Sequence, residues 1–306
     1  LKKNNKYWKK GLPYLARFTE VIIPENNTQI ASLISGEIDA CYQVPFEWIP
    51  KLRENPNTNV LTLPCASFTD VRMRADKKPF NDNKVRLAFK YCLNREAFTK
   101  AAIGGNGVPG NDLPIAPWNK YFDNTISLRK QDYGKAKQLL AEAGYPNGLT
   151  VTLYSSSARV AQLETAITLK EQCKPAGIEI DVKNIEPARF WAEHWKDSDF
   201  NCGNWSFRID PDVIFRQSFY TGSSWNYSRY SNPELDNLLD VARKEASESK
   251  RKEMYSKAQR IIFEDGPWLV PTLRNDVIGL RKGVHWGVDK PPHGYTNTWL
   301  EQTWKE

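Results

Sequence analysis

Hydrophobic positions follow two spacings along the chain, and their alternation predicts strands separated by helices. Compact apolar runs at residues 18–23, 38–42 and 60–63 are typical of strands. Between them, residues 28–35 and 47–54 place apolar side chains three or four positions apart, which is the spacing of an amphipathic helix. This order predicts a sheet whose strands are joined by crossover helices.

The same alternation returns after Lys77, Lys78 and Pro79, which interrupt the first run. Several of the later elements end at Gly or Pro, as helices and strands commonly do. The pattern therefore predicts a second sheet domain. The predicted helices cover residues 83–103, 133–143, 159–174, 187–196, 212–219, 233–246 and 250–265, and the predicted strands cover residues 149–154, 178–185, 200–205, 268–274 and 277–280.

A chain of 306 residues has room for two domains or one large one, and it can bury a core without disulfides or metals. Charged residues make up 26% and hydrophobic ones 40%, the ordinary balance of a globular protein. The net charge of +7 comes from Lys and Arg residues scattered along helical faces, which does not favour nucleic acid as a partner. No run of 18 apolar residues is present, so the sequence predicts no membrane-spanning helix.

The sequence contains no motif that predicts catalysis, a metal or a cofactor. The three His are far apart, none of the five Cys forms a C-x-x-C pair, and there is no nucleophile elbow or phosphate-binding loop. Residues 105–110 spell G-x-G-x-x-G, but a predicted helix precedes them and Pro109 lies inside them, so we do not interpret them as a nucleotide site. The protein is therefore predicted not to be an enzyme, with no catalytic residues, no metal and no cofactor.

Aromatic and charged residues gather where the predicted strand 200–205 ends. Trp205 closes the strand, and Arg208 and Asp210 lie in the turn before the next helix. Sheets flanked by helices bind ligands at strand ends, where Trp offers a rigid apolar wall and Arg binds anions or carbonyls. The alternative is a buried Trp beside a helix cap, in which Arg208 pairs with Asp210 or Asp212 and only fixes the turn.

Five segments resemble, in order, motifs of the family 5 extracellular solute-binding proteins. Residues 7–40, YWKKGLPYLARFTEVIIPENNTQIASLISGEIDA, resemble the family's YW-x-G-x-PYLD…ALxSGEID segment. Residues 77–98, KKPFNDNKVRLAFKYCLNREAF, resemble its KPFDDxxVRxAxxYAxDR signature. Residues 133–148, 230–245 and 251–271 are similar to its LLxEAGYxxG, YxNPExDxLLxxA and AQxxLxxDxPxxxP segments, so the matches cover nearly the whole chain.

The resemblance implies an α/β fold of the periplasmic binding protein type, class II-like (cluster C), with two lobes and mixed sheets flanked by helices. Residues 77–281 would form the C-terminal lobe, and residues 1–76, with 282–306 returning, would form part of the other. Members of the family carry a long N-terminal part before the segment that begins at residue 7. The chain is therefore expected to be a truncated form with one lobe incomplete.

The implied function is that of the substrate-binding component of an ABC importer, which captures an oligopeptide, opine or saccharide-like solute in a cleft between its lobes. The implied partner is the membrane permease, and the implied location is the periplasm, or the cell exterior with membrane attachment in a Gram-positive host. We expect a monomer. Two alternatives stay open: a hydrolase of peptides or sugars, which clustered carboxylates around Asp210 would favour, and a sensor or chaperone on the same fold.

Two departures from the family's dipeptide binders affect the expected ligand. Those proteins carry an Asp for the ligand's amino group after the Trp of the central strand, whereas here Arg208 lies three positions after Trp205. They also carry an Arg for the ligand's carboxylate where this chain has a Ser, with Arg159 close by. Arg208 would favour a carboxylate, phosphate or carbonyl group. The predicted ligand-binding residues are Tyr42, Tyr154, Ser156, Arg159, Trp205, Arg208, Asp210, Trp225 and Asn226.

Overall fold

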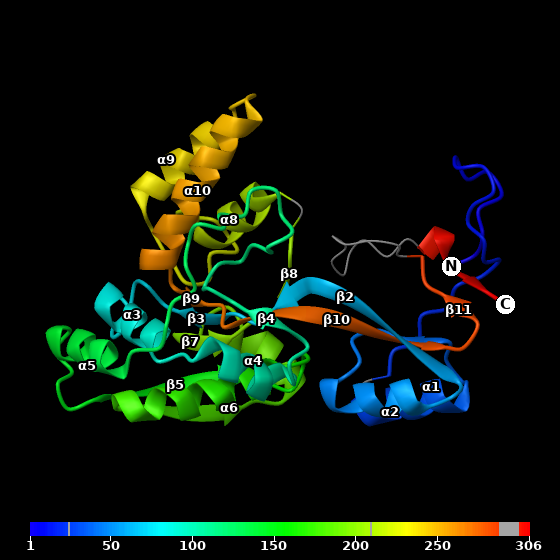
Figure 1. The fold of residues 1–306 in the computed structure, drawn as a ribbon, viewed down its shortest axis with the longest axis horizontal. Coiled ribbons are helices and arrows are strands. Elements are labelled where there is room, and N and C mark those ends of the chain that lie inside the picture. The colour runs from blue at the N-terminus through cyan, green and yellow to red at the C-terminus, as the bar shows by residue number, and fades with distance from the viewer. Residues whose placement is uncertain (24, 209, 288–299) are drawn as a thin grey trace. The chain divides into compact units, whose positions relative to one another are not determined.

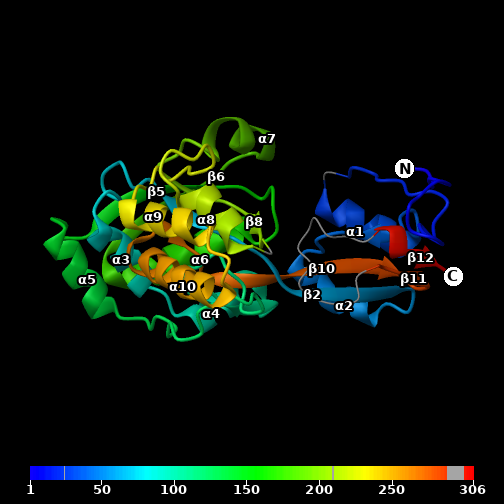
Figure 2. The same cartoon turned by 90° about the horizontal axis from the view of Figure 1, so that it is seen from above.

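Helices and strands alternate along most of the chain. Figures 1 and 2 show the ribbon of the computed structural model in two views at right angles. The structure describes residues 1–23, 25–208, 210–287 and 300–306, and it describes residues 65 and 66 without their side chains.

The chain divides into two units by packing. Unit 1 comprises residues 1–66 and 275–306, and unit 2 comprises residues 67–274. The chain leaves unit 1 inside β2 (Thr58–Phe68) and returns to it inside β10 (Thr272–Arg281). The lobe boundaries that the family resemblance implies, after residues 76 and 281, lie ten and seven residues later than these crossings.

Unit 1 has its core between two helices and a strand pair. α1 (Asn26–Ser35) and α2 (Ile49–Glu54) contribute buried apolar side chains, and β1 (Ala40–Cys41) pairs antiparallel with the second half of β10. Gly36 ends α1 with a positive φ of 88°, a conformation that Gly adopts without strain. The remaining elements are η1 (Phe46–Trp48), β11 (Val284–His285), η4 (Leu300–Gln302) and β12 (Trp304–Lys305), and β11 pairs with β12.

Residues 18–23 form no strand, although the sequence predicts one. Val21 and Ile22 are exposed, and among the described residues the nearest pairing is an isolated bridge between Lys2 and Arg17. A strand is stable only when a neighbour binds its backbone N–H and C=O groups. An apolar run without such a neighbour therefore stays irregular.

Unit 2 is built on a five-stranded mixed sheet with the strand order β6–β5–β7–β3–β9. β5 runs parallel to β6 and β7, whereas β3 runs antiparallel to β7 and β9. Every second side chain of β5 is buried, which is the pattern expected of a strand with one covered face. The strands are β3 (Val71–Met73), β5 (Leu149–Ser155), β6 (Ile178–Asn184), β7 (Phe200–Cys202) and β9 (Trp268–Leu269).

Two helices, α3 (Asn83–Tyr91) and α4 (Arg95–Ile103), replace the single helix that the sequence predicts over residues 83–103. The Asn94 side chain accepts a hydrogen bond from Ala97 N and so caps a new helix. Asn favours caps because its side chain competes with the helical backbone for hydrogen bonds. The other helices of unit 2 are α5 (Tyr133–Glu142), α6 (Gln162–Cys173), η2 (Lys174–Ala176), α7 (Pro187–Arg189), η3 (Phe190–His194), α8 (Pro211–Phe219), α9 (Pro233–Ala242) and α10 (Glu248–Asp265).

The G-x-G-x-x-G segment serves strand packing. Its strand β4 (Gly107–Pro109) pairs antiparallel with the start of β10. A Cβ atom on Gly107 would lie 2.2 Å from the carbonyl oxygen of Leu273, and one on Gly110 would lie 2.1 Å from that of Val270. Only Gly permits so close an approach of two backbones.

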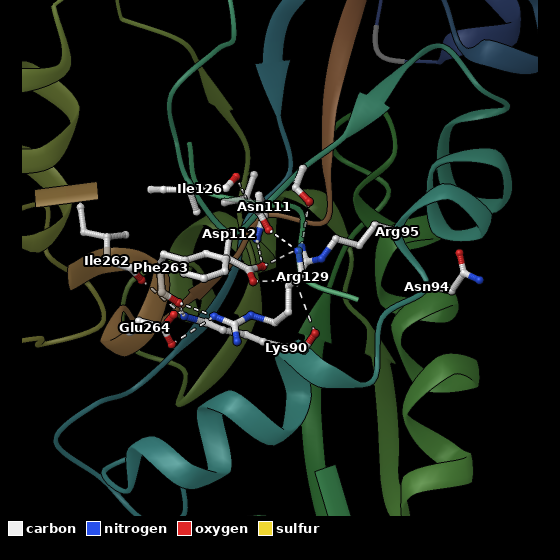
Figure 3. A network of polar contacts seen from close by, with 12 residues as sticks. Lys90, Asn94, Arg95, Asn111, Asp112, Ile126, Arg129, Ile262, Phe263 and Glu264 are labelled. Atoms are coloured by element: carbon white, nitrogen blue, oxygen red, sulfur yellow. Dashed lines mark hydrogen bonds and ion pairs between the residues drawn. The ribbon is translucent and has the colours of Figure 1, made fainter. Parts of the chain in front are cut away.

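A buried polar network joins α3 and α4 to the end of α10 (Figure 3). Arg95 donates to both carboxylate oxygens of Asp112, at 3.0 and 2.6 Å. Lys90 is fully buried, and its Nζ donates to the carbonyl oxygens of Phe263 at 2.9 Å and Ile262 at 3.4 Å. These carbonyls lie in the last turn of α10, where a helix has donors for only some of its oxygens.

Gly203 divides the strand that the sequence predicts over residues 200–205. The Gly203 N–H donates to the carbonyl oxygen of Asp70 at 2.8 Å, beside the pairing of β7 with β3. The chain then enters β8 (Trp205–Ser206), which pairs antiparallel with Ser67 and Phe68 at the end of β2. Trp205 therefore lies in a different sheet from β7.

Candidate ligand-binding site

Five aromatic rings of unit 2 form a continuous row, which we call the aromatic row. The ring centroids of Trp191 and Trp195 are 5.4 Å apart, and those of Trp195 and Tyr227 are 4.8 Å apart. Tyr227 lies 6.3 Å from Trp225, which in turn lies 5.6 Å from Trp205. These are contact distances for aromatic pairs, so the rings form one connected apolar cluster.

Separate elements bring these rings together. Trp191 lies in the π-helix η3, and Trp195 follows it, with its backbone N–H donating to the carbonyl oxygen of Phe190 at 3.0 Å. Trp225 and Tyr227 lie in the loop after α8, and Trp205 lies on β8. Trp225 is 43% exposed whereas Trp205 and Tyr227 are buried, so the row lies partly at the surface of unit 2 and partly in its core.

Three arginines lie over rings of the aromatic row. The guanidinium carbon is 5.5 Å from the Trp191 ring for Arg159, 5.4 Å from the Tyr227 ring for Arg72, and 5.9 Å from the Trp205 ring for Arg208. A cation at this distance is attracted by the ring and keeps donors for a further acceptor. The row therefore combines apolar walls with positive charge, which suits a ligand that carries acidic or carbonyl groups.

Arg208 forms a local backbone contact and, among the described residues, no ion pair. Its Nη1 donates to the carbonyl oxygen of Ser206 at 3.0 Å, and among the described residues no carboxylate pairs with it. Burial lowers the pKa of the Arg208 guanidinium from its ordinary value. The ion pair with Asp210 or Asp212 that would make Arg208 purely structural does not form.

Asp210 instead caps α8. Its carboxylate accepts a hydrogen bond from Asp212 N at 2.9 Å, as the helix-cap alternative predicts. Asp212 pairs with Arg216 at 3.1 Å and with Arg243 at 3.6 Å. Burial raises the pKa of Asp212 although both arginines lower it. These carboxylates hold α8 against α9, and their contacts give no support to a ligand-binding role for Asp210.

Tyr154, Ser156 and Arg159 lie near one end of the aromatic row. The Tyr154 ring stacks on His194 of η3, with centroids 4.5 Å apart. Ser156 is buried, and its hydroxyl accepts a hydrogen bond from Ala158 N at 3.2 Å, so it shapes the turn after β5. Of the three, Arg159 alone is exposed, beside Trp191.

Asn226 builds the loop that carries Trp225 and Tyr227. Its side-chain amide donates to the carbonyl oxygens of Tyr220 and Tyr230 and accepts from Tyr230 N, at 2.7 to 3.1 Å. With these bonds Asn226 positions the two rings. Tyr42 lies in unit 1, where its hydroxyl donates to Asp276 Oδ2 at 3.0 Å.

The sequence interpretation misses Trp191, Trp195, Tyr227, Asp70 and Arg72. The first two could be noticed from their spacing of four positions, which places them on one side of a helix. No sequence pattern reveals that Tyr227 meets Trp195, because that contact joins distant segments. Asp70 and Arg72 flank an apolar strand residue and suggest solvent exposure, yet both are buried.

Asp70 and Arg72 form an ion pair beside the aromatic row. Arg72 Nε lies 2.8 Å from Asp70 Oδ2, and the exposed fractions of these side chains are 3% and 0%. Burial raises the pKa of Asp70, and the nearby Arg72 and Trp205 oppose that rise. The pair therefore carries two opposite charges into the interior at the junction of β3, β7 and the row.

Among the described residues, no three His, Cys, Asp or Glu side chains lie together as ligands for a metal ion. Within that same part of the chain, no helix is long and apolar enough to cross a membrane.

Comparison with known proteins identifies relatives of one kind. Residues 1–227 match the family described as bacterial extracellular solute-binding proteins, family 5, middle region. The glutathione-binding protein GsiB of Pectobacterium atrosepticum is 29% identical over 281 residues, which are 86% of this chain and 53% of that protein. GsiB of Escherichia coli K12 is 29% identical over 280 residues, 88% of this chain and 54% of that protein. The chain thus spans about half the length of these curated relatives.

Solved structures share the fold. The periplasmic binding protein AgaA of A. tumefaciens R10, in complex with agropinic acid, superposes with a TM-score of 0.86 at 25% identity, over 100% of this chain and 64% of AgaA. The periplasmic binding protein DppA of Helicobacter pylori, with the peptide STSA, gives a TM-score of 0.87 at 24% identity, over 100% and 60%. The prediction of a mixed α/β fold of the periplasmic binding protein type is confirmed.

Proposed function

The chain belongs to the family 5 bacterial extracellular solute-binding proteins, and from that premise we propose that it captures a small, polar, acid-bearing solute for an ABC importer. The observation that carries the proposal is the aromatic row of unit 2 with a guanidinium group over three of its five rings. Rings of this kind hold the apolar parts of a ligand, and arginines bind its carboxylate or carbonyl groups.

The names of the relatives agree with this chemistry. GsiB is named for glutathione, and AgaA was solved with agropinic acid; both compounds are organic acids. We take peptide-like and opine-like acids as the solute class for this chain. Arg208 and Arg159, at opposite ends of the row, are the proposed contacts for the acidic groups, and Trp225 is the proposed exposed wall.

Members of the family act outside the cytoplasm, as their description states. We extend this to a periplasmic or cell-surface location, with a membrane permease as the partner that receives the solute. The hydrolase alternative has less support, because Asp210 caps a helix and Asp212 is paired with Arg216 and Arg243. No observation favours the sensor or chaperone alternative.

Binding can be tested with the 306-residue chain and a panel of solutes. Isothermal titration calorimetry and tryptophan fluorescence would be recorded with glutathione, agropinic acid and short peptides. We expect at least one to bind and to change the emission, since ring stacking with a ligand alters the surroundings of Trp225. Native mass spectrometry of gently purified protein would show any retained solute directly.

A pair of variants assigns the site. Trp225→Ala should weaken binding and reduce the fluorescence response, because it removes the exposed ring of the row. Trp8→Ala is the matched control, since Trp8 is 76% exposed in unit 1 and lies outside the row. Equal effects of both variants, or no binding of any solute in the panel, would refute the proposal.

A further inference from the structure

The ion pair of Asp70 and Arg72 lies at a buried strand, a place that apolar side chains usually fill. Arg72 lies in the middle of β3 between Val71 and Met73, and in the register it stands opposite Asn201 of β7. Both flanking side chains are completely buried. Replacing a buried ion pair by apolar residues is often neutral or stabilising, so the pair adds little to the fold.

Some polar atoms of this pair have no hydrogen-bond partner among the described residues. Arg72 Nη1 is buried and has no hydrogen-bond partner among the described residues. The contact of Nε with Asp70 is close, but its hydrogen-bond alignment is poor, so it is chiefly an ion pair. Buried donors are paired in nearly all proteins, and an unpaired one on a guanidinium group indicates a missing partner.

A glycine lets the pair pack closely against the backbone. A Cβ atom on Gly203 would lie 2.3 Å from Arg72 Nη2 and 2.4 Å from Asp70 Oδ1. Any other residue at position 203 would therefore press on both charges. Tyr227 covers one side of the guanidinium group, and the indole of Trp205 faces the Asp70 carboxylate. The pair thus adjoins two rings of the aromatic row.

We propose that Arg72 is the residue that recognises a carboxylate of the bound solute, with Asp70 as the positioning residue that holds its Nε side. This inference rests on the proposed function and names the group that the site selects. Asp70 leaves the Nη edge of the guanidinium group for the ligand, and that edge forms paired hydrogen bonds with a planar carboxylate. Asp70 already balances the charge of Arg72, so the pair disfavours anions of higher charge and favours a ligand group with a single negative charge.

The recognition step can be followed without knowing the natural solute. In a ¹H–¹⁵N spectrum of arginine Nε–H groups, the Arg72 signal is identified by its loss in Arg72→Lys. Titration with sodium acetate, against sodium chloride at equal ionic strength, should shift this signal. An Arg72 signal that acetate moves no more than chloride does would overturn the subsite.

Selectivity is then measured with glutathione and its diethyl ester, in which both carboxylates are masked. We expect the wild type to bind the acid more tightly. Arg72→Gln alone leaves Asp70 buried without its partner and can unfold unit 2. The binding measurement therefore uses the double variant Asp70→Asn/Arg72→Gln, which removes both charges. It should lose about 30-fold or more in affinity for the acid, and its preference for the acid over the ester should fall by a similar factor, leaving the part that Arg208 and Arg159 supply.

Arg74→Gln is the matched control, because Arg74 follows on the same strand path but pairs with Asp76 at 2.8 Å. It should keep the preference for the acid. If the folded double variant keeps that preference, or Arg74→Gln loses it equally, Arg72 is not the recognising residue while solute binding itself stands. If the wild type binds no solute of the panel, the proposed function fails, and the acetate titration alone decides on the subsite.

Discussion

The buried ammonium group of Lys90 should make the stability of unit 2 rise with pH. Nζ donates to two carbonyl oxygens in the last turn of α10, at 2.9 Å for Phe263 and 3.4 Å for Ile262 (Figure 3). Burial nevertheless lowers the pKa of Lys90 from 10.5 to about 7, and the cations of Arg129, Arg86 and Arg95 add to that effect. The side chain is fully buried, so solvent does not screen the shift.

The sign follows from proton binding. Between pH 7 and 10.5 the unfolded chain keeps its proton on Lys90, whereas the folded chain has largely lost it. Stability rises with pH wherever the unfolded state binds more protons. Each pH unit inside this window is worth about 1.4 kcal/mol, and the whole window about 5 kcal/mol. From pH 7 to pH 9 the contribution of Lys90 to the free energy of unfolding should grow by about 2 kcal/mol.

Lys90→Met removes the titration while it keeps an unbranched side chain. Both carbonyls retain a donor in the variant, because Gly266 N binds Ile262 O at 2.8 Å and Arg129 binds Phe263 O at 3.1 Å. Urea unfolding followed by tryptophan fluorescence would be measured at pH 7 and pH 9 for both proteins. Between pH 7 and pH 9 the free energy of unfolding of the wild type should rise by about 2 kcal/mol relative to that of the variant.

The same comparison for Lys100→Met supplies the control, since Lys100 is exposed on α4. The difference in free energy of unfolding between Lys100→Met and the wild type should be the same at pH 7 and pH 9. Parallel stability curves for the wild type and Lys90→Met would show that Lys90 stays charged in the fold, and the reasoning from burial would be wrong.

Three further predictions concern the other buried polar groups. Asp112→Asn breaks the paired hydrogen bonds to Arg95 and should cost about 3–5 kcal/mol in urea unfolding, and a loss below 1 kcal/mol would contradict a buried charge pair. Asn226→Ala removes three hydrogen bonds of the loop that carries Trp225 and Tyr227 and should cost about 1–3 kcal/mol, with changed tryptophan emission; an unchanged spectrum would contradict a positioning role. Gly203→Ala should weaken acid binding in calorimetry because the new Cβ presses on Arg72, and unaltered affinity would show that the backbone yields there.

Most of the order of elements and the family were predictable from the sequence. The spacing of hydrophobic residues and the Gly and Pro residues that end elements predict α5, β5, α6 and β6 to within a few residues. Each of these elements buries one face, and its hydrophobic periodicity reflects that face. The resemblance to the family rests on short motifs, and the comparisons confirm it. The break between α3 and α4 was also readable locally, from Asn94 as a cap, although the amphipathic pattern continues across it.

Part of the candidate site was also predictable. Trp205, Arg208 and Trp225 lie on or over the aromatic row, as a strand end rich in rings and charge suggests. Arg159 lies over it as well, but that prediction came from the family resemblance. Whether these residues bind a solute stays a prediction.

Only the tertiary structure decided the rest, since it depends on contacts between distant segments. The apolar run at residues 18–23 is no strand because, among the described residues, its backbone pairs with a neighbouring segment only at Phe18, which exchanges hydrogen bonds with Leu1. The row needs η3, β8 and the loop after α8 to meet, and their sequence separation hides that meeting. Arg72 is charged and therefore predicted to face water, yet its ion pair with Asp70 and the close packing that Gly203 permits let it lie inside. Hydropathy describes the free-energy cost of burying one residue by itself. In the folded protein that cost depends on the partners that lie beside the residue.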